Sequence, residues 1–474
     1  MIAPSVLALL VAQAPLPAAA PCPPPSGASR VATCILHSPA PRPLGSFGTR
    51  TLALSFDDDP HPDLAVAEPA PQAPGMAGRV WVFRGPSFDE ALLLVPQLSQ
   101  AEDRFGTSLA AADLDGDGRD ELVVGAPHHD AGPFAKDVGF VSIWSFKAGG
   151  PTEWMQLHPG IPQPGGRFGT AVAVGNVIGA ARVDVAVGTP FRRVTGTTLD
   201  AGTVSVFAFH PGPIVTETIW ENPKPSSDHG EFGNRLAVTD WNGDGLDDLV
   251  VAAIFNDVGA VPHGGQVFVL GHVAEGAPAT ILARLDNPYA GGEGANPACV
   301  SERYGMTLDA GDLDGDGFGE VLVGANRDDH QGVCEAGRGS LFSGAHAGGA
   351  VPATLPFVHP TPAPFDLMAY RVDLADIVGG PELDVVVGSA AANQAQVALV
   401  WDGAGLLGPG GFPAATPLPV HGFEALHGHG PHSSGDLSSG DLDRDGREEL
   451  ILGDYDAPLG PHPRVGRVLI TWWP

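Results

Sequence analysis

Four acidic segments of the sequence have the residue types and spacing of a cation-binding loop. In the segment 312–324, carboxylates stand at positions 1, 3, 5 and 9, which are Asp312, Asp314, Asp316 and Glu320. Gly317 at position 6 allows a sharp turn, and the carbonyl oxygen of Phe318 at position 7 could complete a shell of oxygen ligands. Closely spaced carboxylates repel one another, and a hard divalent cation with about six to eight oxygen ligands removes that repulsion. The segment therefore predicts a divalent-cation site, with Ca²⁺ as the expected ion.

An EF-hand loop is the alternative interpretation, and it fails at position 12. An EF-hand needs a bidentate Glu at this position. Val323 stands there instead, inside the apolar run Val321–Val323. We therefore expect a buried strand, and not a helix, to follow the loop.

Three further segments repeat this pattern, and each precedes an apolar strand. Their expected ligands, with a main-chain carbonyl at position 7 and side chains elsewhere, are Asp113, Asp115, Asp117, Arg119 and Glu121; Asp240, Asn242, Asp244, Leu246 and Asp248; and Asp441, Asp443, Asp445, Arg447 and Glu449. Together with the first segment they predict about four Ca²⁺ sites.

Three weaker copies extend the series to seven. Asp57, Asp59 and Asp63 form an incomplete loop, with Pro60 in place of the glycine, and could supply a fifth, weaker site. The segments 176–188 and 376–388 keep the strand but lack carboxylates at positions 3 and 5, so we expect them to bind no cation. The first positions of the seven copies are Ser55, Asp113, Asn176, Asp240, Asp312, Asp376 and Asp441. A sequence motif that recurs at this spacing indicates a repeat fold.

Each unit carries further motifs around its loop. A Phe-Gly or Tyr-Gly pair precedes position 1 by eight residues in five units, and its aromatic residues are Phe47, Phe105, Phe168, Phe232 and Tyr304. Units six and seven have Met368-Ala369 and Ser433-Ser434 at this place. Gly-Ala-Pro or a variant follows the second strand, and a Gly-led alternating strand comes next. This pattern resembles the FG-GAP repeat of the integrin alpha-chain head, and the resemblance covers Gly45–Pro474.

The resemblance implies an all-β, seven-bladed β-propeller of four-stranded antiparallel blades. The blades would start near residues 45, 103, 166, 230, 302, 366 and 431. A content of 65 Gly and 47 Pro agrees with short strands joined by many turns. Only three strands of the last unit remain in sequence, and an open ring would expose a strand edge. We therefore predict that the strand-like segment Arg30–His37 pairs with Arg467–Trp472 and closes the ring.

The amino-terminal residues favour export. Residues 5–12 form an apolar run that is too short to span a membrane. We interpret residues 1–20 as a signal peptide and residues 21–44 as a Pro-rich lead that contains the closing strand. Calcium loops of low affinity fill only outside the cytosol, which also predicts a secreted or cell-envelope protein. Four cysteines allow three pairings, and we expect Cys22 with Cys34 and Cys299 with Cys334, free thiols being the alternative.

Charge and loop variation indicate the class of partner. The formal net charge of −31 argues against nucleic acid and anionic membranes, so we expect a protein or glycan ligand. The loops on the face opposite the cation loops vary most in length and composition, as binding loops on a rigid scaffold do. We expect the partner on that face, with candidate contacts at His128, His129, Arg192, Arg193, Asp328, Asp329 and His330.

Catalysis is the competing class of function. The sequence contains no Gly-X-Ser-X-Gly elbow, P-loop or HEXXH motif, and a loop repeated around a ring suits stabilisation better than a single active site. We therefore expect a recognition or adhesion module that is not an enzyme. The alternative is a polysaccharide lyase or hydrolase, which would need His, Arg and Tyr side chains converging on the ring axis. The His-rich segment His421–His432 could bind zinc, but we expect a solvated linker loop there.

Overall fold

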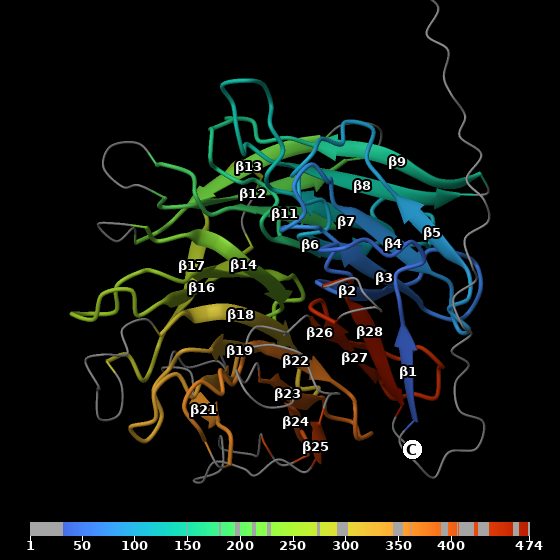
Figure 1. Ribbon diagram of the computed structural model, residues 1–474. Helices are drawn as coiled ribbons and strands as arrows, with labels where there is room; N and C mark the ends of the chain where they lie inside the picture. Colours follow the sequence, from blue (N-terminus) through green and yellow to red (C-terminus); the bar gives the residue numbers. More distant parts are fainter. Residues whose placement is uncertain are drawn as a thin grey trace, which may run out of the picture.

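The protein is a ring of seven four-stranded antiparallel sheets in the computed structural model (Figure 1). The structure describes residues 32–147, 149–179, 182–194, 200–210, 215–224, 229–272, 275–291, 302–344, 354–360, 362–389, 397–404, 406, 421–424, 436–457 and 464–472. Within these ranges, all of the regular secondary structure consists of β-strands. The predicted all-β, seven-bladed propeller is therefore confirmed.

Blades one to three each use four consecutive strands, numbered from the ring centre outward. Blade one contains β2 (Thr51–Leu54), β3 (Asp63–Glu68), β4 (Arg79–Phe83) and β5 (Ala91–Leu94). Blade two contains β6 (Ser108–Ala112), β7 (Glu121–Ala126), β8 (Phe140–Lys147) and β9 (Gly150–Leu157). Blade three contains β10 (Val172–Gly175), β11 (Asp184–Thr189), β12 (Thr203–Phe209) and β13 (Val215–Glu221).

Blades four to six follow the same order. Blade four contains β14 (Phe232–Thr239), β15 (Asp248–Ala253), β16 (Gln266–Gly271) and β17 (Thr280–Asp286). Blade five contains β18 (Tyr304–Gly311), β19 (Glu320–Ala325), β20 (Arg338–Phe342) and β21 (Thr354–Phe357). Blade six contains β22 (Arg371–Ala375), β23 (Asp384–Gly388), β24 (Val397–Trp401) and β25 (His421–Glu424).

Blade seven takes its outermost strand from the other end of the chain. Its inner strands are β26 (Leu437–Gly440), β27 (Glu449–Asp454) and β28 (Arg467–Trp472), and β1 (Ala32–Leu36) pairs antiparallel with β28. The register runs from Ala32 opposite Trp472 to Leu36 opposite Val468. Figure 1 shows β1, in blue, beside β28, in red. The predicted closure by an amino-terminal strand is confirmed.

Burial follows the position of a strand within its blade. The second strands, such as β3, β7 and β11, are buried at every residue because neighbouring blades cover both faces. The third strands are buried as well, although their alternating sequence is typical of a half-exposed strand. Solvent reaches the fourth strands, of which β17 has four exposed residues. The core therefore consists of contacts between blades, with apolar side chains of β-branched and aromatic type.

In blades one to five, the Phe-Gly or Tyr-Gly pair joins the blade to the one before it. Phe168 is fully buried and forms a bridge with Gly139, which leads the third strand of blade two. Gly169 has a φ of 88°, and a Cβ on it would lie 2.8 Å from the carbonyl oxygen of Phe140. Glycine is therefore required by both the left-handed conformation and the close approach. In blade six, Met368 forms the equivalent bridge and Ala369 takes the left-handed conformation, which explains how this unit tolerates the loss of the motif.

Strand order places the loops on two faces. The predicted cation loops join the first and second strands of each blade, so they emerge together on one face, which we call the cation face. Loops between the second and third strands, and connections from one blade to the next, emerge on the opposite face, which we call the partner face.

Two sequence predictions fall partly outside the described residues. The proposed signal peptide (residues 1–20), Cys22 and Cys299 lie there. None of the described cysteines is a free thiol, and the pairing Cys22–Cys34 and Cys299–Cys334 stays a prediction. Among the described residues, no helix is long and apolar enough to cross a membrane.

Candidate metal centres

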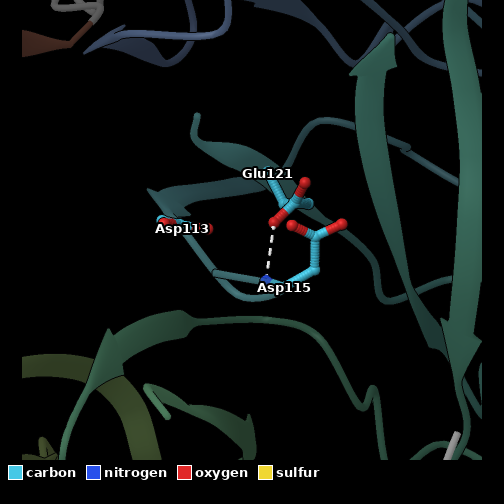
Figure 2. Close-up of side chains that lie close together, drawn as sticks. All are labelled: Asp113, Asp115 and Glu121. Carbon is cyan, nitrogen blue, oxygen red and sulfur yellow. Dashed lines mark hydrogen bonds between the residues drawn. The ribbon is translucent and has the colours of Figure 1, made fainter. Parts of the chain in front are cut away.

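Three of the predicted loops bring three carboxylates together. The groups are Asp113, Asp115 and Glu121 in blade two; Asp312, Asp314 and Asp316 in blade five; and Asp441, Asp443 and Glu449 in blade seven. In each group, one oxygen from each residue lies within 4.8 Å of the others. Figure 2 shows Asp115 and Glu121 of blade two facing each other across the loop. This donor set, made of carboxylate oxygens, suits a hard divalent cation.

The carboxylate of the first aspartate in a loop accepts main-chain hydrogen bonds that shape the turn. The carboxylate of Asp113 accepts hydrogen bonds from the main-chain N–H groups of Gly116 at 2.7 Å, Asp117 at 3.0 Å and Gly118 at 2.9 Å. In blade five, Asp312 accepts the equivalent bonds from Gly315, Asp316 and Gly317. Because these bonds pull the backbone inward, the residues at positions 3 and 5 are brought beside the first carboxylate. The loop is thus arranged by its own sequence before any cation enters.

A buried carboxylate at position 9 is common to all seven blades. The residues are Asp63, Glu121, Asp184, Asp248, Glu320, Asp384 and Glu449, each at most 2% exposed. Glu320 accepts a hydrogen bond from Leu313 N at 2.9 Å, and Asp384 of blade six accepts one from Ile377 N at 2.9 Å. The second oxygen of Asp384 accepts from Gly403 N after the third strand. This residue therefore fastens the loop to the blade even where no cation is expected.

Burial raises the pKa of these position-9 carboxyls. The pKa of Glu320 and of Glu449 rises to about 8, and the pKa of Glu121 to about 7. The largest cause is desolvation, and repulsion from the neighbouring loop aspartates adds to it. A divalent cation beside these groups would act in the opposite direction, because it favours the ionised form.

The blade-seven loop has a further feature that fits a divalent cation. Asp441 Oδ1 of blade seven is buried and has no hydrogen-bond partner. A buried carboxylate oxygen without a partner is costly, and a coordinated cation would satisfy it. The remaining oxygens would come from positions 3, 5 and 9 and from the carbonyl at position 7.

The blade-four loop folds in the same way but gathers fewer charges. Gly245 N donates to Asp240 Oδ2 at 2.7 Å and Leu246 N donates to Asp244 Oδ1 at 3.0 Å, as in the other loops. Position 3 is the neutral Asn242, and position 9 is the shorter Asp248. Among the described residues, no group of three carboxylates forms in this loop. We therefore expect its cation to bind more weakly than those of blades two, five and seven.

The blade-one loop shows why its site would be poorer still. Asp57 Oδ2 lies 3.6 Å from Arg84 Nε, and Asp59 Oδ1 accepts a hydrogen bond from His61 N at 2.8 Å. Position 1 is Ser55, whose N–H is bonded to Asp120 of blade two. The carboxylates of this loop therefore already have internal partners.

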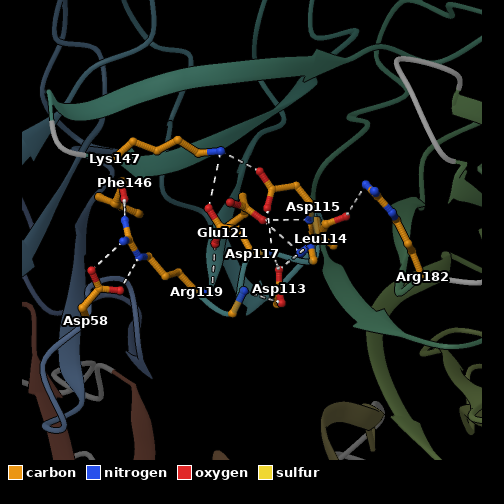
Figure 3. A network of polar contacts seen from close by, with 12 residues as sticks. Asp58, Asp113, Leu114, Asp115, Asp117, Arg119, Glu121, Phe146, Lys147 and Arg182 are labelled. Atoms are coloured by element: carbon orange, nitrogen blue, oxygen red, sulfur yellow. Dashed lines mark hydrogen bonds and ion pairs between the residues drawn. The ribbon is translucent and has the colours of Figure 1, made fainter.

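Side chains at positions 7 and 8 link neighbouring loops, and these links were not predicted from the sequence. Arg119 at position 7 of blade two donates from Nε to Asp58 of blade one at 2.9 Å, and Phe318 of blade five lies against Gly243 of blade four. Asp247 at position 8 of blade four accepts a hydrogen bond from Asn176 N of blade three at 2.7 Å. Figure 3 shows Arg119 reaching Asp58 and Arg182 reaching the carbonyl of Leu114. The sequence signal was the recurrence of large or charged side chains at these two loop positions.

A lysine supplies a positive charge to the blade-two loop. Lys147 Nζ lies 2.8 Å from Asp115 Oδ2 and 3.4 Å from Asp117 Oδ2 (Figure 3). Since Lys147 stands at the end of β8, directly beyond the loop, a cation entering this site would have to displace the ammonium group. The site is therefore predicted to bind a cation in competition with its own lysine.

We predict that Lys147→Met strengthens cation binding in blade two by a few fold, the size expected for an exposed ion pair. A calcium titration of the melting temperature measures this as a lower midpoint concentration. Lys224→Met, which changes an exposed lysine on the partner face, serves as the matched control. An equal midpoint in all three proteins would show that Lys147 does not compete.

The seven predicted partner contacts are not equally accessible. Arg193 is exposed, and His128, Arg192 and His330 are partly buried. His129, Asp328 and Asp329 are at most 8% exposed, so little of their surface is open to a partner. These three follow the buried second strands directly, where polar side chains need internal partners: His129 Nδ1 lies 3.2 Å from Asp103, and Asp328 lies 2.9 Å from Arg338 Nε.

A cavity of about 670 Å³ lies on the partner face, over blades one and two. Its charged and histidine side chains come from the blade-two loop and from the connections between blades, namely Glu102, Arg104, His128, Asp130, Lys136, Asp137 and Arg167. His128 pairs with Asp137 at 2.9 Å. Arg167 Nε is buried without a hydrogen-bond partner, and Arg104 has no ion-pair partner among the described residues. Burial and repulsion from Arg167 lower the pKa of Arg104. Of these lining residues, only His128 was predicted from the sequence as a contact.

Comparisons with known proteins agree with the repeat. Residues 105–144 and 304–342 match the FG-GAP repeat, and residues 56–124 match an FG-GAP-like repeat. Integrin alpha-PS2 of Drosophila melanogaster is 34% identical over 230 residues, which cover 44% of this chain and 15% of that protein. Integrin alpha-IIb of Homo sapiens is 30% identical over 229 residues, which cover 47% of this chain and 20% of that protein.

An enzyme is also among the similar proteins. The phosphatidylinositol-glycan-specific phospholipase D of Mus musculus is 26% identical over 225 residues, which cover 46% of this chain and 18% of that protein. The chain thus matches about a fifth or less of the length of these three relatives.

Proposed function

Because the chain carries FG-GAP repeats in a seven-bladed β-propeller similar to part of integrin alpha chains, we propose that it is an exported, calcium-binding recognition module. It binds Ca²⁺ in the loops of the cation face, and it binds a protein ligand on the partner face. The chain itself performs no catalytic step in this proposal. The cavity over blades one and two is the observation that carries it.

Calcium has a structural role in this proposal. The loop carboxylates of blades two, five and seven lie close enough to repel one another, and each position-9 carboxyl is buried in the blade. A bound Ca²⁺ removes the repulsion and ties the first strand to the second. The ion therefore stabilises blades whose opposite ends carry the loops of the partner face. We expect calcium to affect partner binding indirectly, because it stabilises the fold of these blades.

The partner cavity suits a carboxylate group of a protein ligand. Arg104 and Arg167 line it with guanidinium donors, and two of the three lining carboxylates, Asp130 and Asp137, pair instead with Lys136 and His128. Guanidinium groups bind carboxylates through paired, charge-assisted hydrogen bonds. The loops around the cavity come from a rigid ring, as is common for binding surfaces. Acidic side chains of a protein are the expected contacts, and an acidic glycan is the alternative outcome.

An array of extracellular proteins and glycans, probed with the full chain in calcium, tests this proposal. We expect Arg104→Ala combined with Arg167→Ala to weaken binding to the ligands found by about tenfold or more, since two charge-assisted contacts are lost. Arg284→Ala, which changes a half-exposed arginine on β17, is the matched control. Calcium-dependent melting should stay unchanged in both variants.

Two results would contradict the assignment of the face. The double variant could bind like the unchanged protein, or binding could disappear only when residues beside the cation loops, such as Arg119 or Arg447, are replaced. Either result would move the partner site away from the cavity.

A further inference from the structure

One residue of each blade occupies the same place at the start of the innermost strand. This position lies five residues before the first loop position, and its residues are Arg50, Ser108, Ala171, Arg235, Thr307, Arg371 and Asp436. We call these seven residues the axial ring. They are far apart in the sequence, but the repeat gives them one register, so three arginines and a single aspartate meet at one level of the propeller.

The axial ring surrounds a cavity at the centre of the propeller. The cavity has a volume of about 180 Å³ and is lined by all seven ring residues together with their neighbours in the first strands. Its volume is several times the roughly 30 Å³ that one water molecule takes in the liquid. Because the ring residues stand at the beginning of strands that run toward the cation loops, the cavity lies toward the partner face.

The charges of the axial ring do not balance. Asp436 Oδ1 lies 3.2 Å from both Arg50 Nη1 and Arg371 Nε, and Asp436 Oδ2 accepts a hydrogen bond from Thr51 N at 2.9 Å. One carboxylate thus serves two arginines. Arg235 comes from blade four, across the ring from blades seven and one. The ring therefore carries three positive charges and one negative charge in a chain whose formal net charge is −31.

Arg235 has no acidic partner of its own among the described residues. Its Nη1 donates to the carbonyl oxygen and to the side-chain oxygen of Asn234, at 2.8 Å and 2.7 Å. Glu231 reaches this network only through Asn234 Nδ2. Burial, followed by repulsion from Arg50 and Arg371, lowers the pKa of Arg235 to about 9. The other guanidinium donors of Arg235 stay available to a ligand in the cavity.

We propose that the axial cavity binds one compact oxyanion of two negative charges, such as sulfate or hydrogen phosphate. The net charge of the ring matches such a dianion, and guanidinium groups are the side chains best suited to bind planar or tetrahedral oxyanions. The hydroxyl groups of Ser108 and Thr307 add neutral donors to the lining. The site does not depend on the cation loops or on the identity of the protein partner.

Binding, and not catalysis, is the chemistry that the lining supports. Converging arginines are part of what a polysaccharide-active site would need on the axis. However, no histidine or tyrosine is among the described residues that line this cavity, and its one carboxylate is held in ion pairs with two arginines. The ring can therefore hold an anion without a group placed to move a proton.

Calorimetric titration of sodium sulfate into the full chain, at fixed free calcium and constant ionic strength, tests the proposal. We expect one sulfate per chain in the unchanged protein. In Arg235→Gln the affinity should fall on the order of tenfold or more, because a charged donor opposite the ion pairs is lost. Arg284→Gln, which changes an arginine on the outermost strand of the same blade, should bind sulfate like the unchanged protein.

Two further measurements distinguish an arginine that binds the ligand from one that only stabilises the fold: the melting temperature of Arg235→Gln and the sulfate affinity of a second variant. Without sulfate, Arg235→Gln should melt at the same temperature as the unchanged protein or higher, because repulsion within the ring is relieved. Asp436→Asn should bind sulfate more tightly, since the ring then carries one more net positive charge. The proposal is overturned if sulfate binds no better than chloride, if Arg235→Gln binds it equally well, or if folded Asp436→Asn binds it less tightly.

Discussion

Removal of the ring-closing strand is expected to abolish the cooperative unfolding of the propeller. Deleting residues 26–38 removes β1 and leaves the edge of β28 without its antiparallel partner. It also removes Leu36, which is 1% exposed and packs in the same apolar cluster as Val468, Ile470 and Trp472. Since each blade packs only on its neighbours, a weakened seventh blade exposes blade one and blade six as well.

Point substitutions give the same test without shortening the chain. Leu36→Ala should lower the free energy of unfolding by about 2–5 kcal/mol, the usual cost of deleting a buried leucine side chain. Ile35→Ala is the matched control, because Ile35 is the adjacent residue of the same strand and is 38% exposed. Circular dichroism during heating measures both. Unchanged melting of the deletion variant would refute closure by β1.

Removal of calcium is expected to have the second large effect. A ligand that binds only the folded state adds about 2.7 kcal/mol per site when its free concentration is roughly 100 times the dissociation constant. With several filled loops, excess chelator should therefore lower the melting temperature on the order of 10 °C or more. Differential scanning calorimetry of the same preparation in calcium and in chelator measures this shift.

A single loop variant shows where that stability comes from. Asp314→Ala removes one carboxylate of the blade-five group, so it should lower the melting temperature in calcium and change it little in chelator. Asp257→Ala, in a loop of the partner face, is the control and should respond to calcium like the unchanged protein. Equal melting temperatures in calcium and in chelator would contradict a stabilising role for the ion.

The repeat made the fold predictable from the sequence. Seven copies of one loop-and-strand motif predicted seven blades. The last unit has only three strands in sequence, and Arg30–His37 was therefore predicted to supply the fourth. Burial of the third strands was not foreseen, because the alternation of Val80 and Val82 with Trp81 and Phe83 resembles a half-exposed strand. In a propeller, both faces of such a strand are covered by apolar neighbours.

Single side chains were harder to predict than the backbone. His129 and Asp328 look like exposed loop residues, but each pairs with a charged group from a distant segment, Asp103 and Arg338 respectively. The axial arginines escaped notice for a related reason. They occur in only three of the seven units, so no motif marks them, and their convergence depends on ring closure as well as on the repeat register.

The direct test of calcium binding on the cation face is a count of bound ions. Protein stripped of metal with chelator, then dialysed against radioactive calcium, should bind about four ions per chain, and Asp314→Ala should bind about one fewer. Blades three and six should contribute none, because Asn176 and Asp376 have no carboxylates beside them at positions 3 and 5. No calcium bound above background, or an equal count in Asp314→Ala, would contradict the proposed calcium loops.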